Sequence, residues 1–270
     1  MKRPKHNWQD MTTLDFQCED RASWIAVLPV SAVEQHGPHL PLSTDRVIGE
    51  GLLAGALMQM PDALPVTCLP MQAVGKSNEH IGFPGTVTQS WQTTIQAWIE
   101  IGESVYRAGL RKLIIINSHG GNAAMIDIVA QELRARYDML VVATSWMKFG
   151  VPENLFEAEE IAFGIHGGDI ETSLMLHFSP ELVDQDKADN FRSSQEDFMH
   201  EFKQLRAHGP VSFGWCAQDL NEHGVTGNAT LASAEKGKAL AQFQTAAFVD
   251  LCNDVHGFDL ARLLKAKGCD

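Results

Sequence analysis

Short apolar runs alternate with helical patterns along the first half of the chain, and this alternation constrains the possible folds more than any other feature. Four strand-sized, mostly apolar runs lie at 24–30, 66–74, 112–117 and 139–144, and the first is continuously apolar, as in a strand covered on both faces. Apolar residues spaced three to four apart separate these runs at 46–60, 87–105 and 122–137. Because strands joined through helices run parallel, we predict an α/β protein with a doubly wound, mostly parallel sheet and helices on both faces.

The second of these helices carries boundary signals. Thr86 followed by Gln89 forms a capping-box pattern at its start, and Gly109 ends it. Trp91 and Trp98 fall on its apolar face, so we expect both indole rings in the core.

A last helix is expected at about 232–255, with Phe243 on its apolar face. In the helix at 122–137, Ile128 is expected on the apolar face. No linker of shifted composition interrupts the chain. A single domain over 1–270, with its core at about 20–255, is the resulting prediction.

The net charge and the cysteine content limit which partners and which cellular compartment we expect for this protein. The 34 acidic residues outnumber the 21 basic ones, a net charge of −13 that would repel a phosphate backbone, so we expect no nucleic-acid partner. No apolar stretch reaches the ~18 residues of a membrane span, and no apolar segment follows the basic start, so we expect no membrane partner. Five cysteines without a Cys-x-x-Cys pair indicate reduced thiols and a cytoplasmic protein.

Acids and histidines follow two of the predicted strands. Glu34, His36 and Asp45 come after the first strand, and His119 comes after the strand at 112–117, in a Gly-Gly turn. Ligands of open parallel sheets bind beyond the carboxyl ends of the strands, so these side chains can converge. Each residue taken singly has another explanation. Asp45 could simply be an acid in the first turn of a helix, Glu34 an acid in an exposed loop, and His36 a surface histidine.

A third cluster, at 166–173, opens another predicted helix and contains His166, Asp169 and Glu171. Three clusters of histidine and acid favour a metal centre over solvated loops. Nitrogen and oxygen ligands without cysteine suit two divalent cations that share one aspartate, Zn²⁺ foremost, with Mn²⁺ or Fe²⁺ as alternatives.

Such a centre supports hydrolysis, which also requires a proton for the leaving nitrogen. His166 is our candidate for the proton carrier. Asp169 or Glu171 would orient its ring or complete the coordination shell.

Together these motifs resemble the creatininase (creatinine amidohydrolase) family. The resemblance rests on Glu34 to Leu42 with Thr44-Asp45, Glu79-His80 with Phe83 to Thr86, Asn117 to Asn122, and His166 to Gly168 with Glu171 to Ser173. Segments 224–227 and 234–237 are similar to the family's closing segment, so the likeness spans about 20–245.

The resemblance implies a two-metal hydrolase of a non-peptide C–N bond in a small cyclic amide or formamide. It further implies Glu34, His36, Asp45 and His119 as ligands, with Asp45 as the bridge, and a homo-oligomer, a hexamer in relatives. The creatinine-hydrolysing prototype has a carboxylate where this chain has Gly121, so Glu171 becomes the expected fifth ligand. A second departure is Asp169, where many relatives have Glu.

Substrate contacts are expected from the long loop and the strand exits, namely from His80, Trp146, Gly120, Gly121 and Asn122. Trp146 and Trp215 could cover a flat planar substrate, and packing within the protein is the alternative role of each.

The Gly121 departure leaves two substrate classes open beside creatinine-like amides. These are formamidopyrimidine intermediates, cleaved by deformylases, and precursors trimmed during redox-cofactor maturation. A non-catalytic metal-binding or ligand-binding module on the same fold is the non-enzymatic alternative.

Overall fold

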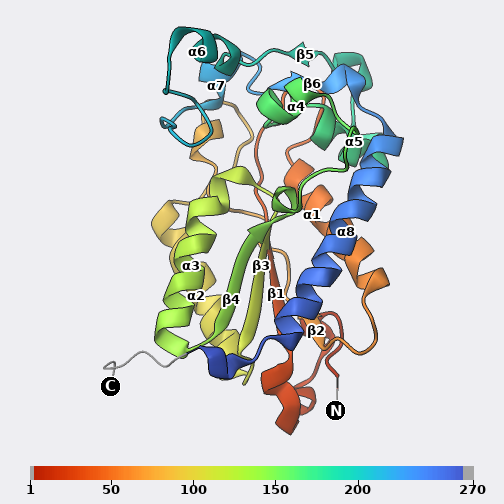
Figure 1. Ribbon diagram of the computed structural model, residues 1–270, viewed down its shortest axis with the longest axis vertical. Coiled ribbons are helices and arrows are strands. Elements are labelled where there is room, and N and C mark those ends of the chain that lie inside the picture. Colours follow the sequence, from red (N-terminus) through yellow and green to blue (C-terminus); the bar gives the residue numbers. More distant parts are fainter. Residues whose placement is uncertain (1–2, 264–270) are drawn as a thin grey trace.

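The computed structural model describes residues 3–263 and is built on a parallel sheet of four strands (Figure 1). The strands are β1 (Ile25–Val30), β2 (Val66–Cys68), β3 (Lys112–Asn117) and β4 (Leu140–Ser145), in the order β2-β1-β3-β4. Every neighbouring pair is parallel, and Ile25 lies opposite Val66 on one side and Lys112 on the other. The predicted parallel sheet is therefore confirmed.

Helices cover both faces of this sheet, as the sequence predicted. On one face lie α1 (Thr44–Gln59), α5 (Asp169–Phe178) and α8 (Ala234–Gly257), and on the other lie α2 (Trp91–Arg107) and α3 (Ala123–Tyr137). Successive residues of β1 point to opposite faces, so Ile25 and Val27 enter the first core while Ala26 and Leu28 enter the second.

The remaining elements lie beyond the sheet, at the top of the view in Figure 1. They are α4 (Ala158–Phe163), α6 (Gln195–Glu201), α7 (Ala217–Leu220), and a two-stranded antiparallel sheet of β5 (Asn190–Phe191) and β6 (Gly227–Asn228). Short 3-10 turns connect the larger elements, among them Asn78–His80, Gly120–Asn122 and Trp146–Phe149.

The predicted strand at 66–74 is shorter than expected. Regular pairing ends at Cys68, although Gln72 still forms a bridge with Val30. Pro70 lies between them and has no N–H to donate to the ladder, which explains the interruption.

The predicted start of the second helix is wrong. The α2 helix begins at Trp91, and the Ser90 hydroxyl caps it by accepting a hydrogen bond from the Thr93 N–H. Val87 instead bridges to Val33, so residues before Ser90 are engaged with the loop after β1.

The predicted core positions need three corrections. Trp98 is buried, but Trp91 is 54% exposed because it occupies the first turn of the shortened helix. Ile128 of α3 and Phe243 of α8 are also exposed, beside the buried stripes of their helices.

The described part of the chain contains no helix with the length and apolar content needed to cross a membrane. Its four cysteines, Cys18, Cys68, Cys216 and Cys252, are free thiols. Cys269 lies outside the described residues, as do both ends of the expected 1–270 domain, and the single domain stays a prediction.

Candidate metal centre

Four side chains from two strand exits meet in the interior beyond the carboxyl ends of β1 and β3. Glu34, His36, Asp45 and His119 are each at most 5% exposed. Their burial excludes the alternatives of an exposed loop acid and a surface histidine. Asp45 does lie in the first turn of α1, yet its carboxylate faces the imidazoles of His36 and His119.

The loop after β1 is folded so that Glu34 and His36 point the same way. The Glu34 N–H donates to the Leu42 carbonyl, and His36 bridges to Leu40, which closes the loop on itself. Gly37 makes the turn at φ +69°, a conformation that favours glycine.

Backbone carbonyls orient both imidazoles of the centre. His36 Nδ1–H donates to the Glu34 carbonyl at 3.1 Å, which leaves Nε2 3.4 Å from Asp45 Oδ1. His119 Nε2–H donates to the Lys76 carbonyl at 2.9 Å, which leaves Nδ1 3.1 Å from Glu34 Oε1. A carbonyl can only accept, so each contact assigns the donor nitrogen and turns the other nitrogen toward the carboxylates.

Several buried polar atoms at this point have no hydrogen-bond partner, and three of them are Glu34 Oε1, His36 Nε2 and Asp45 Oδ2. Burying such atoms unpaired is costly, and a bound cation would remove that cost. Possible ligand atoms within 4.8 Å of one another form three groups. These are Glu34 with Asp45 and His119, His36 with Asp45 and Glu171, and Glu34 with His36 and His166. The residues present therefore fit a metal site, and the first two groups share Asp45.

The charges of the centre are strongly coupled. Burial opposes ionisation of Glu34, yet the neighbouring His119 holds the pKa of its carboxyl well below the usual value. Burial and the Glu34 charge raise the pKa of Asp45 to about 6. For the imidazoles, the facing carboxylates outweigh burial and raise the pKa of His36 to about 9 and that of His119 to about 10. Imidazolium protons thus balance the carboxylates in the cation-free protein, and a bound cation would displace them.

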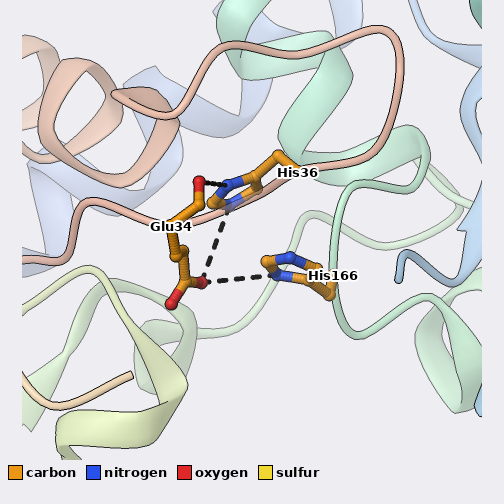
Figure 2. A group of neighbouring side chains, drawn as sticks. All are labelled: Glu34, His36 and His166. Atoms are coloured by element: carbon orange, nitrogen blue, oxygen red, sulfur yellow. Dashed lines mark hydrogen bonds and ion pairs between the residues drawn. The ribbon is translucent and has the colours of Figure 1, made fainter. Parts of the chain in front are cut away.

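His166 joins the centre from the loop before α5, as Figure 2 shows. Its Nε2–H donates to the Gln35 carbonyl at 2.8 Å, and its Nδ1 lies 3.7 Å from Glu34 Oε1. Burial lowers the pKa of this imidazole, so the ring is neutral and Nδ1 is free to accept a proton.

His80 lies beside His166, with ring centroids 4.2 Å apart, and the Gln35 side chain holds it there. The Gly37 N–H donates to Gln35 Oε1 at 2.9 Å, and Gln35 Nε2 donates to the Gly224 carbonyl and to His80 Nδ1. His80 Nε2 therefore carries its proton, 3.6 Å from Glu34 Oε1. We did not predict this role of Gln35 from the sequence, and its position within the Glu34-Gln35-His36 motif was the available signal.

The two acids of the third cluster face different ways. Glu171 Oε2 accepts a hydrogen bond from the Gly167 N–H at 2.6 Å and lies 3.8 Å from His36 Nε2. Asp169 is fully buried, and its oxygens pair with Ser173 Oγ and with Lys236 Nζ of α8. Asp169 therefore anchors α5 to α8, whereas Glu171 is the acid that faces the centre.

The expected substrate-facing residues have varied surroundings. Trp146 is 3% exposed and packs on Phe149 and Phe248, which favours its alternative role in the core. Asn122 is buried and ties two loops together, through the Ser31 carbonyl and the Lys76 N–H. At Gly120 an added Cβ would meet no atom within 4 Å. Trp215 is half-buried in the loop before α7.

One supporting acid has no local sequence signal. Glu160 of α4 is buried, and its carboxylate accepts hydrogen bonds from the N–H groups of Ile170, at 3.2 Å, and Asn228, at 3.0 Å. Glycines surround it where a Cβ would collide with the carboxylate, at Gly164, Gly168 and Gly227. Glu160 thus holds the start of α5, and with it Glu171, against β6.

The fold and the site define an α/β protein with a buried centre of carboxylates and imidazoles at the carboxyl ends of parallel strands. A family model described as creatininase, creatinine amidohydrolase, matches residues 9–252. This chain belongs to the creatininase family and is an enzyme, a hydrolase of carbon–nitrogen bonds.

Several known proteins are similar to it. A mycofactocin precursor peptide peptidase of Mycolicibacterium smegmatis is 30% identical over 222 residues, which are 80% of this chain and 79% of the relative. A creatinine amidohydrolase of Pseudomonas putida is 31% identical over 179 residues, 60% of this chain and 67% of the relative. Two solved creatininase structures, one described with Mn and one mutant of Zn-Zn type, share the fold with TM-scores of 0.75 at 23% identity. Each covers 94% of this chain and 100% of its own.

Proposed function

We propose that this protein is an amidohydrolase that uses two divalent cations to cleave a C–N bond of a small molecule. Glu34, Asp45 and His119 would hold one cation, His36, Asp45 and Glu171 would hold the other, and Asp45 would bridge them. The observation that carries this proposal is the set of unpartnered atoms on Glu34, His36 and Asp45, buried where both groups meet. Zn²⁺ is the expected ion, with Mn²⁺ or Fe²⁺ as alternatives, because all the donors are nitrogen and oxygen.

Bound divalent cations lower the pKa of a coordinated water and polarise a substrate carbonyl. The chain itself supplies the proton transfer. His166 is neutral, and its Nδ1 faces the centre, so it can accept the proton of the attacking water and return it to the leaving nitrogen. The Gln35 carbonyl keeps the proton on Nε2 and so keeps Nδ1 available.

Glu171 is held in place for the role of ligand that the proposal gives it. The Gly167 N–H holds Oε2, so the carboxylate is fixed within 3.8 Å of His36 Nε2. A carboxylate fixed in this way completes the coordination shell without side-chain reorganisation when a cation binds.

Two classes of activity are considered for this site. In the first, a creatinine-type reaction opens a cyclic amide. In the second, the enzyme is a deformylase or a hydrolase of cofactor maturation. The mycofactocin precursor peptide peptidase, 30% identical across 80% of this chain, favours the second class. The departure at Gly121 favours it too, because the acid of the prototype is missing there.

A substrate panel on protein of known metal content tests the proposal. Purified protein should carry close to two divalent ions per chain by elemental analysis, and activity lost on chelation should return with Zn²⁺ or Mn²⁺. Creatinine, a formamidopyrimidine and a short peptide should then be compared as substrates. Turnover of the peptide or the formamidopyrimidine above that of creatinine supports the second class. Metal binding without turnover of any C–N substrate would favour the non-catalytic module.

The cytoplasmic location and the homo-oligomeric, hexameric state remain proposals taken from the cysteine content and from the family resemblance. Light scattering on the purified protein tests the second.

A further inference from the structure

Gly121 lies against the side chains of Glu79 and His119. A Cβ built on Gly121 would come closer than any real Cβ contact to Glu79 Oε1 and to His119 Nε2, and would lie 2.8 Å from the Lys76 carbonyl oxygen. The preceding Gly120 is different, because a Cβ there meets nothing within 4 Å. The space beside Gly121 is thus filled by the carboxylate of Glu79 and the edge of the His119 ring.

Glu79 is held firmly in this space. Its Oε2 accepts a hydrogen bond from Lys76 Nζ at 2.6 Å, and its side chain is only 12% exposed. Its Oε1 lies 3.5 Å from His119 Nε2. The same nitrogen donates to the Lys76 carbonyl at 2.9 Å. The N–H on His119 Nε2 therefore faces a carbonyl and a carboxylate together, while Nδ1 faces Glu34 and Asp45.

An anion beside one ring nitrogen of a histidine favours the proton on that nitrogen and strengthens the other nitrogen as a ligand. It also resists rotation of the ring. Glu79 does not belong to any of the three groups of possible ligand atoms. Its effect on a cation would pass through His119.

We propose that Glu79 is a positioning residue for the metal ligand His119, and that residue 121 must be glycine because the Glu79 carboxylate occupies the space of its side chain. This inference rests on the proposed function, since it takes His119 to be a ligand. This chain thus has an additional acid in the loop before α2, at Glu79, and has no side chain at position 121.

Cobalt binding tests the first half of the proposal, because Co²⁺ replaces Zn²⁺ and its visible absorption reports the ligand geometry. We expect Glu79→Gln to weaken Co²⁺ binding about 10- to 100-fold in competition with a chelator, the usual cost of losing an outer partner of a ligand. The absorption band should shift as well, while the unfolding midpoint of the metal-free protein stays near that of the parent. Glu132→Gln is the matched control, since it also removes an ion-paired glutamate, on the exposed side of α3.

Adjacent glycines test the second half. Gly121→Ala should weaken Co²⁺ binding and alter the absorption band, whereas Gly120→Ala should leave both unchanged, because only the first substitution displaces Glu79 and His119. Equal binding by the two alanine variants would overturn the steric claim.

The possible failures are distinguishable. If the parent binds Co²⁺ and Glu79→Gln binds it with the same affinity and spectrum, this inference is wrong while the proposed function stands. If the parent itself binds no divalent cation, both are wrong.

Discussion

At the scale of single residues, Asp45 lies between two imidazoles of the centre. It lies 3.4 Å from His36 Nε2 through one oxygen and 3.4 Å from His119 Nδ1 through the other. Because its two oxygens face different imidazoles, it belongs to both groups of ligand atoms that would hold the two cations. Glu171 belongs to only one of these groups, and its side chain is 24% exposed.

This difference predicts unequal metal content in two isosteric variants. Asp45→Asn should lose both ions, with affinity reduced at least about 100-fold, since losing a ligand costs no less than losing its outer partner. Glu171→Gln should keep close to one ion per chain. Elemental analysis after dialysis measures the content, and two retained ions in Asp45→Asn would contradict a bridging role.

Residue identities were the most predictable part of the centre. Glu34, His36, Asp45 and His119 were expected to converge because acids and imidazoles follow the strand exits, and the family resemblance implied them as ligands. The directions of the side chains were less predictable. Asp169 stands in the same cluster as Glu171, yet its carboxylate pairs with Lys236, which is distant in sequence and reaches it only in the folded chain.

At the scale of elements, the packing of α5 against α8 holds the third cluster in place. Gly237 of α8 lies directly on the backbone of α5, where a Cβ would collide with the Ser173 carbonyl. The Asp169–Lys236 ion pair adjoins this contact. Backbone cannot give way as a flexible side chain can, so the two helices depend on a glycine at this crossing.

We therefore expect Gly237→Ala to force α8 away from α5 and to destabilise the protein by about 1–3 kcal/mol, the usual cost of overpacking. Gly257→Ala is the control, because it lies in the same helix and a Cβ there meets nothing within 4 Å. Urea unfolding of both variants measures the free energies. Similar free energies of unfolding for the two variants would show that the close contact between α8 and α5 at Gly237 does not contribute to stability.

Long elements were predictable, and their edges were less so. The periodicity of 46–60 and 122–137 anticipated α1 and α3 to within a few residues, because an amphipathic face is a property of the segment itself. The start of α2 was mispredicted because Val87, in the loop before this helix, pairs with Val33, in the loop after β1. That pairing is a tertiary contact, and a capping pattern cannot reveal it.

At the scale of the whole molecule, buried neutral histidines couple stability to pH. His39 is 1% exposed and donates through Nε2 to the Gly167 carbonyl and Thr172 Oγ1, which joins the loop after β1 to the start of α5. Burial lowers the pKa of His39 to about 4. In the unfolded chain its pKa is near 6.5, so between these values the unfolded state binds more protons.

The stability that His39 contributes should accordingly be complete above pH 6.5 and be lost as the pH falls toward 4. One proton accounts for up to about 1.4 kcal/mol per pH unit within that window. Metal-free His39→Gln should be less stable than the parent at pH 7.5 and should show a shallower loss between pH 6.5 and 4.5. Urea midpoints across this range measure it, and parallel curves for the two proteins would rule out His39 as a source of the pH dependence.

The sequence by itself determined the parallel α/β sheet and the family, and it predicted which acids and imidazoles come together in the centre, because periodicity and residue chemistry are local properties. The tertiary structure alone decided which acid faces the centre, which tryptophan is buried, and that Glu79 fills the space beside Gly121. The physical reason is that direction and space depend on side chains brought together from distant parts of the chain. Lys76 follows β2, whereas His119 and Gly121 follow β3, and these residues meet because β2 and β3 both flank β1 in the sheet.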